Sequence, residues 1–149
     1  LSAGRYGSTV VARGGRDLLL GGERGDYLRG GDGNDTIHGA DGNDTMEGDA
    51  DNDVLRGGAG RDFLRGGDGN DYMNGGIGND TIHGKNGNDI LVGEAGDDEM
   101  QVAPQLSSWR VTIRRTSLEV TSSNTTTSSS RCSPESLSSS LAAILRCRE

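Results

Sequence analysis

Aliphatic residues recur at every ninth position between residues 12 and 101 of the chain. They occupy the eighth position of ten nine-residue units, which begin at Ala12 and run through Gln101 without insertion or deletion. They are Leu19, Leu28, Ile37, Met46, Leu55, Leu64, Met73, Ile82, Leu91 and Met100. The seventh position favours β-branched and aromatic residues, such as Val54 and Tyr72, and the ninth is mostly polar. Because successive side chains of a strand point to opposite faces, positions seven to nine predict a three-residue strand with one inward side chain.

The first six positions of each unit are rich in glycine, which suits tight turns. Position one is Gly in nine units and position four in eight. Two units, each a turn and a strand, would close one coil, so ten units predict five coils stacked at a strand spacing of about 4.8 Å. The expected fold class is all-β: a right-handed parallel β-roll, or β-solenoid, with 18 residues per coil. An irregular C-terminal tail is expected to follow it.

The sixth position is aspartate in all ten units. These residues are Asp17, Asp26, Asp35, Asp44, Asp53, Asp62, Asp71, Asp80, Asp89 and Asp98. In stacked coils each Asp lies beside the Asp two units later, and such like charges repel unless a cation lies between them. Ca²⁺ accepts six to eight oxygens from carboxylates and carbonyls, whereas Mg²⁺ demands octahedral geometry, and zinc and copper prefer His and Cys. The ten Asp therefore predict calcium sites, at most eight in number when same-side neighbours share an ion.

The pattern G-G-x-G-x-D-x-U-x, as in GGDGNDTIH at 30–38, resembles the RTX nonapeptide, the haemolysin-type calcium-binding repeat. The resemblance covers residues 12–101, about 60% of the chain. It implies calcium-binding turns with the ten Asp as side-chain ligands. It also implies an extracellular, bacterial type of protein, exported by a type I secretion apparatus.

Several units depart from the pattern, which puts their sites in doubt, and the calcium sites are expected above all between Asp35 and Asp89. The departures are Arg24 and Asp51 at position four, Arg61 beside Asp62, and Lys85 and Glu94 at position two. Residues 1–11 form a lead-in, and residues 3–11 are interpreted as a decayed eleventh unit with Ser8 in place of Asp.

Charge divides the chain at the end of the repeats. Residues 12–101 carry 20 acidic and 8 basic side chains, whereas residues 102–149 carry 3 acidic and 6 basic ones. The acidic body disfavours nucleic acid and anionic membranes as partners, and favours multivalent cations. With only 30% apolar residues, the chain has little material for a core. Calcium is therefore expected to act as a folding switch after export.

Composition changes sharply after residue 101. Of the 48 residues from Val102 to Glu149, 19 are Ser or Thr and none is Gly. Alternation of apolar and polar residues in Trp109–Thr121 predicts a hairpin or edge strand. The Ser/Thr-rich run 122–130 predicts a flexible linker. A short helix is predicted from the spacing of Leu137, Leu141, Ile144 and Leu145. Three interpretations of this tail stay open: a cap on the roll, a secretion signal, or aberrant sequence from a shifted reading frame. Whether Cys132 and Cys147 pair also stays open.

No catalytic motif and no apolar run of membrane-spanning length occurs in the sequence. The leading hypothesis is a non-enzymatic calcium-binding module that folds on calcium binding. The alternative is the C-terminal fragment of a larger secreted enzyme, of the protease, lipase or epimerase type, or of a pore-forming toxin. The repeat does not choose between these, because fold alone does not imply function.

Overall fold

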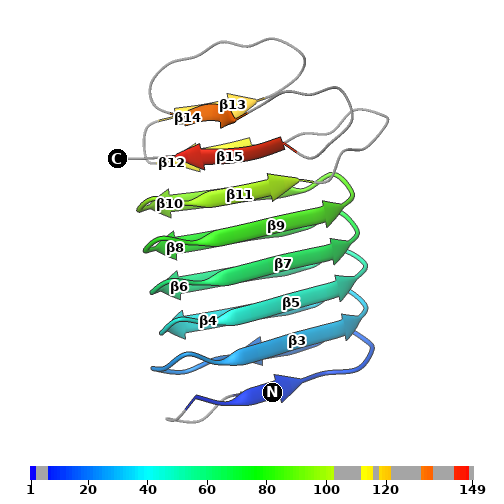
Figure 1. Cartoon of the computed structure of the whole chain (residues 1–149). Helices are drawn as coiled ribbons and strands as arrows, with labels where there is room; N and C mark the ends of the chain where they lie inside the picture. Colours follow the sequence, from blue (N-terminus) through cyan, green and yellow to red (C-terminus); the bar gives the residue numbers. More distant parts are fainter. Residues whose placement is uncertain (3–6, 103–111, 116–117, 122–131, 136–142, 148–149) are drawn as a thin grey trace.

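A computed structural model describes residues 1–2, 7–102, 112–115, 118–121, 132–135 and 143–147, the last four ranges as backbone strands. The repeats form two sheets of parallel strands that lie face to face (Figure 1). One sheet contains β1 (Thr9–Val11), β3 (Tyr27–Asp32), β5 (Thr45–Ala50), β7 (Phe63–Asp68), β9 (Thr81–Asn86) and β11 (Glu99–Val102). The other contains β2 (Leu18–Leu20), β4 (Thr36–Asp41), β6 (Val54–Ala59), β8 (Tyr72–Ile77) and β10 (Ile90–Ala95).

Paired residues in neighbouring strands of either sheet are eighteen positions apart. Leu28 is opposite Met46 in the first sheet, and Ile37 is opposite Leu55 in the second. The chain alternates between the two sheets, so each coil consists of two units. The predicted all-β parallel roll with an 18-residue coil is confirmed.

The strands are longer than the sequence pattern predicted. From β3 to β10 each strand has six residues instead of three. The ladder continues into the second and third positions of the following unit, as in Gly31 opposite Asp49 and Asp32 opposite Ala50. Identical stacked coils offer matching backbone donors and acceptors at these positions too, and buried backbone groups require such partners. Pairing therefore extends past the residues with strand-favouring side chains.

The turns depend on left-handed backbone at the second and fourth positions. Gly31 has a φ of 108° and Gly33 a φ of 116°, and equivalent glycines in later turns behave alike. The non-glycine residues with positive φ are Ala40, Asp49, Asp51, Lys85 and Glu94. The substitutions at 51, 85 and 94 thus leave the turn shape intact. The turn that contains Arg24 differs, because neither Gly22 nor Arg24 adopts a positive φ.

The core is a single file of eighth-position side chains between the sheets. From Leu19 to Leu91 each of these side chains is 0% exposed, and Met100 is 3% exposed. Burying one such side chain contributes about 1.5–3 kcal/mol. With one such side chain in every nine residues, the roll depends heavily on its backbone ladders and turns.

The stacked arrangement begins before Ala12. Thr9 is opposite Tyr27 in the same eighteen-residue register, and the Ser8 amide donates to Asp26 Oδ1 at 2.6 Å, as aspartate amides do in later coils. Residues 3–6 lie outside the described residues. The interpretation of 3–11 as a decayed unit stays a prediction.

The tail contributes four short strands at the C-terminal end of the roll (Figure 1). They are β12 (Thr112–Arg115), β13 (Leu118–Thr121), β14 (Cys132–Glu135) and β15 (Ala143–Cys147). β12 and β13 form an antiparallel pair, in line with the predicted hairpin or edge strand, of which 109–111 and 116–117 lie outside the described residues; β12 lies beside β10. β15 pairs antiparallel with β11 and with β14, and the latter pairing places Cys132 opposite Cys147.

The predicted short helix is wrong where the structure describes it. Ile144 and Leu145 belong to strand β15, while 136–142 and the predicted linker at 122–130 lie outside the described residues. Without β15, the edge of β11 would have unpaired backbone donors and acceptors. Ala143–Cys147 pairs with this edge as a strand, which a helix could not do. Among the described residues, no helix is long and apolar enough to span a membrane.

Candidate metal centre

The sixth-position aspartates form two ladders along the two edges of the roll. The Asp53 edge comprises the turns that end at Asp17, Asp35, Asp53, Asp71 and Asp89, and the Asp62 edge comprises those that end at Asp26, Asp44, Asp62, Asp80 and Asp98. Except for the half-buried Asp17, these residues are 1–4% exposed. Each lies directly before a strand, and the stacking of the coils places it in line with its neighbours.

Hydrogen bonds join each aspartate to the next one on its edge. The amide of Asp35 donates to Asp53 Oδ1 at 2.8 Å, and the amide of Asp53 donates to Asp71 Oδ1 at 2.9 Å. The same bond joins Asp44 to Asp62 at 2.8 Å and Asp62 to Asp80 at 2.9 Å. All eight predicted same-side neighbours, from Asp17 with Asp35 to Asp80 with Asp98, are joined in this way. The structure therefore brings these pairs together, but it does not test whether they share an ion.

The second carboxylate oxygen of these residues is buried without a hydrogen-bond partner. This holds for Oδ2 of Asp35, Asp44, Asp53, Asp62, Asp71 and Asp80. A buried charged oxygen with no partner is costly, since it loses its hydration and gains nothing in return. Such an oxygen requires either a proton or a cation.

Backbone carbonyls approach the same space between the coils. A Cβ added to Gly48 would collide with Asp53 Oδ2 and lie 2.7 Å from the Gly66 carbonyl oxygen of the next coil. A Cβ on Gly66 would meet Asp71 Oδ2 and the Gly84 carbonyl oxygen in the same way. Glycine at position one thus leaves room for a carboxylate oxygen and a carbonyl oxygen from successive coils.

Burial also shifts the protonation of these carboxyl groups. It raises the pKa of Asp53 to about 7; the hydrogen bond from the Asp35 amide opposes the shift, and the charges of Asp71, Asp35 and Asp49 add to it. Burial likewise raises the pKa of Asp71 and of Asp80 to about 7, and that of Asp44 to about 6. The ionised form is therefore disfavoured until a positive charge arrives.

The donor set fits a calcium ion better than a transition metal. Oxygen atoms alone supply it: Asp carboxylates and turn carbonyls, with no His or Cys in the turns. Within the described residues, no three His, Cys, Asp or Glu side chains cluster closely enough to hold a metal by themselves. A bound ion would thus need the backbone carbonyls as well as two stacked carboxylates.

The N-terminal turns differ from this arrangement. Asp26 Oδ2 accepts a hydrogen bond from the Gly22 amide at 2.8 Å, so the oxygen that is unpartnered in later turns is already satisfied here. This turn also contains Arg24, which departs from the repeat pattern at position four.

A second ladder was not predicted from the sequence. The fifth-position Asn34 Oδ1 accepts the Asn52 amide at 2.9 Å, and Asn52 Oδ1 accepts the Asn70 amide at 2.7 Å. Asn43 and Asn79 act alike on the other edge. The recurrence of Asn at the fifth position of six units is the sequence feature from which this second ladder could have been predicted. These bonds hold the turns in register beside the carboxylates.

Comparison with known proteins agrees with this geometry. The family model of the RTX calcium-binding nonapeptide repeat matches the chain in four copies, over residues 11–46, 20–55, 47–82 and 74–101. No curated protein and no solved structure matches the chain. Since the matched segments together span more than half of the chain and coincide with the stacked turns, the chain belongs to the RTX calcium-binding nonapeptide repeat family.

Proposed function

We propose that the roll binds several calcium ions between same-side turns, with the ten sixth-position aspartates as side-chain ligands. The two ladders of buried carboxylates with an unpartnered Oδ2 carry this proposal. Each ion would be shared by aspartates eighteen residues apart, which allows at most eight ions. When bound, calcium supplies the positive charge that these buried oxygens lack.

We further propose that calcium switches the chain from unfolded to folded after export. If each site has a Kd of about 100 μM, then calcium at about 1 mM contributes roughly 1.4 kcal/mol per site, and about 11 kcal/mol over eight sites. At submicromolar calcium this contribution vanishes. The thin core and the unpartnered buried carboxylates then oppose folding. An extracellular location after type I secretion fits this calcium dependence.

Circular dichroism during a calcium titration tests the switch. We expect a disordered spectrum in chelator and a strand spectrum at millimolar calcium, whereas magnesium at the same concentration should not substitute. Strand content that is already complete in chelator would overturn the switch. Calorimetry that detects no calcium binding would overturn the sites themselves.

A further inference from the structure

The two edges of the roll differ in the charged residues that surround their aspartate ladders. On the Asp53 edge, the central turns, which end at Asp35, Asp53 and Asp71, carry four further carboxylates and no basic residue. These are Asp32, Asp49, Asp51 and Asp68. On the Asp62 edge, the turns that end at Asp44, Asp62 and Asp80 carry only Asp41 and the oppositely charged Arg61. In its three central turns the Asp53 edge, at the right of Figure 1 where the front strands end, is thus the more acidic one; in its outer turns Arg13, Arg16 and Lys85 are basic.

Two of these carboxylates lie at positions that favour glycine. Asp49 has a φ of 83° and Asp51 a φ of 75°. In the described turns with left-handed backbone at position four, Asp51 is the one residue that is not glycine. A non-glycine residue in this region costs on the order of 1 kcal/mol. Neither substitution adds to the core, so the strain has no packing benefit.

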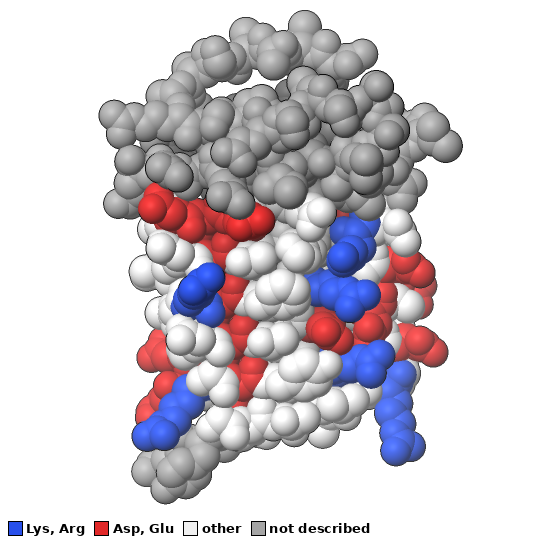
Figure 2. Space-filling model, viewed as in Figure 1, with Lys and Arg blue, Asp and Glu red and all other residues white. Residues whose placement is uncertain are grey.

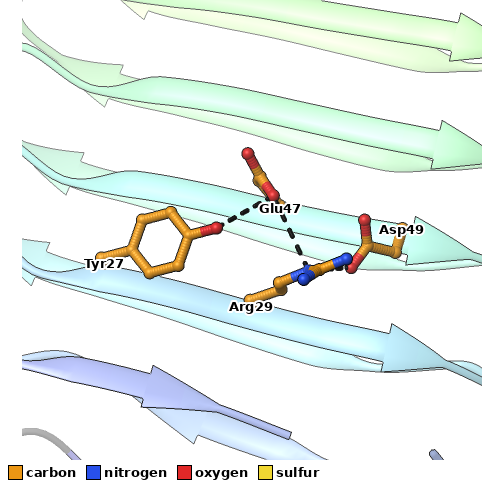
Figure 3. A network of polar contacts seen from close by, with 4 residues as sticks. All are labelled: Tyr27, Arg29, Glu47 and Asp49. Carbon is orange, nitrogen blue, oxygen red and sulfur yellow. Dashed lines mark hydrogen bonds and ion pairs between the residues drawn. The ribbon is translucent and has the colours of Figure 1, made fainter. Parts of the chain in front are cut away.

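Asp49 is already balanced by a cation on the outer face. Arg29 Nε donates to Asp49 Oδ2 at 2.5 Å and lies 3.8 Å from Glu47 Oε2, which accepts a hydrogen bond from the Tyr27 hydroxyl (Figure 3). On this face, acidic and basic side chains flank an uncharged strip (Figure 2). The acidic excess of the central turns on the Asp53 edge therefore rests on Asp32, Asp51 and Asp68.

The same edge contains buried oxygens that require either a proton or a cation. Asp35, Asp53 and Asp71 are each 2% exposed, and Oδ2 of each has no hydrogen-bond partner. Oδ2 of Asp53 and the Gly66 carbonyl oxygen both lie where a Cβ on Gly48 would stand, so this carboxylate oxygen lies in the space between successive turns. The surface carboxylates thus surround a site defined by buried ones.

We propose that the three central turns of the Asp53 edge bind calcium at lower concentrations than the three central turns of the Asp62 edge, and that their occupation sets the calcium concentration at which the roll folds. This inference rests on the proposed function. Nearby surface carboxylates attract a divalent ion over several ångströms, most strongly at low ionic strength. The Asp62 edge then fills with ions after the coils have already stacked.

Two matched substitutions at the third position test the proposal in the full chain. D68N lies beside Asp71 on the Asp53 edge, and D41N lies beside Asp44 on the Asp62 edge; each removes one charge and leaves every sixth-position aspartate in place. At low ionic strength, we expect D68N to raise the calcium midpoint of the dichroism transition about threefold, and D41N to raise it by less than half as much. D51N should behave like D68N, because Asn tolerates left-handed backbone as Asp does.

Equal shifts for D68N and D41N would overturn the inference while leaving calcium binding established. A shift in the order opposite to that expected would overturn it as well. If the unaltered chain shows no calcium binding by calorimetry, the proposed function fails, and this inference fails with it. The effect of D68N should also shrink at about 0.15 M salt, where the screening length is about 8 Å.

Discussion

The two oxygens of a sixth-position carboxylate have different environments, and this difference determines what a substitution does. Oδ1 of Asp62 accepts the amide of Asp44 at 2.8 Å, while Oδ2 is buried without a partner. An asparagine can keep the first contact, since its amide oxygen is also an acceptor. It cannot supply the negative charge that a cation needs. The structural and metal-binding roles of the residue are therefore separable.

For Asp62→Asn we expect the loss of the two sites that Asp62 would share with Asp44 and Asp80. At about 1 mM calcium and a Kd of about 100 μM, the free energy of unfolding should fall by about 2–3 kcal/mol. Guanidinium unfolding in calcium measures this, with Glu47→Gln as a control that removes a charge from the outer face. Equal losses for the two variants would contradict a ligand role for Asp62.

The raised pKa values give the calcium-free chain an unusual dependence on pH. The folded pKa is about 6 for Asp44 and about 7 for Asp53, Asp71 and Asp80, above the ordinary 3.8. Between these folded values and about pH 4, the folded chain binds more protons than the unfolded one, so its stability rises as pH falls through this window. In chelator, we expect more strand signal by circular dichroism at pH 5 than at pH 8. In calcium the trend should reverse, because protons compete with the ion, and the calcium midpoint should rise at pH 5.

At the scale of the elements, the features that follow from repeated side-chain types could be predicted from the sequence. The phase of Leu55 and Asp53 was sufficient to predict an inward strand position, a turn and an eighteen-residue coil, all present in the structure. Strand length was underestimated because glycines such as Gly58 pair through their backbones, and the pattern of side chains gives no information about backbone pairing. The helix expected around Ile144 failed for a related reason: an open sheet edge elsewhere in the chain overrode local spacing. Which oxygens of the aspartates lack partners depends on stacking, so only the structure revealed it.

The turns themselves predict a sharp difference between two glycines. In Gly66→Ala the new Cβ would collide with Asp71 Oδ2 and lie 2.8 Å from the Gly84 carbonyl oxygen. Such overpacking typically costs about 1–3 kcal/mol. In Gly14→Ala the nearest atom would be 3.6 Å away, an ordinary contact, so we expect almost no change. Thermal unfolding in saturating calcium compares the two, and equal melting temperatures would refute the packing described for position one.

At the scale of the whole molecule, a stack of parallel coils has open strand edges at its ends. Unpaired edges invite pairing with other chains, so repeat proteins need protected termini. At the C-terminal end, β15 pairs with β11, and β12 lies beside β10. We infer from this that the tail acts as a cap, one of the three interpretations that the sequence left open.

Removing the tail after Val102 tests this interpretation, because it exposes the edge of β11 without touching any sixth-position aspartate. We expect the shortened chain still to bind calcium, since the ladders are intact. Its calcium midpoint for folding should rise, because the last coil loses its pairing partner, and the folded form should self-associate through the exposed edge. Ile144→Pro should have the same effects in the full chain, since proline removes a ladder donor from β15. Sedimentation velocity and dichroism measure both consequences; a monomeric shortened chain with an unchanged midpoint would show that the roll needs no cap, and that the tail has another role or none.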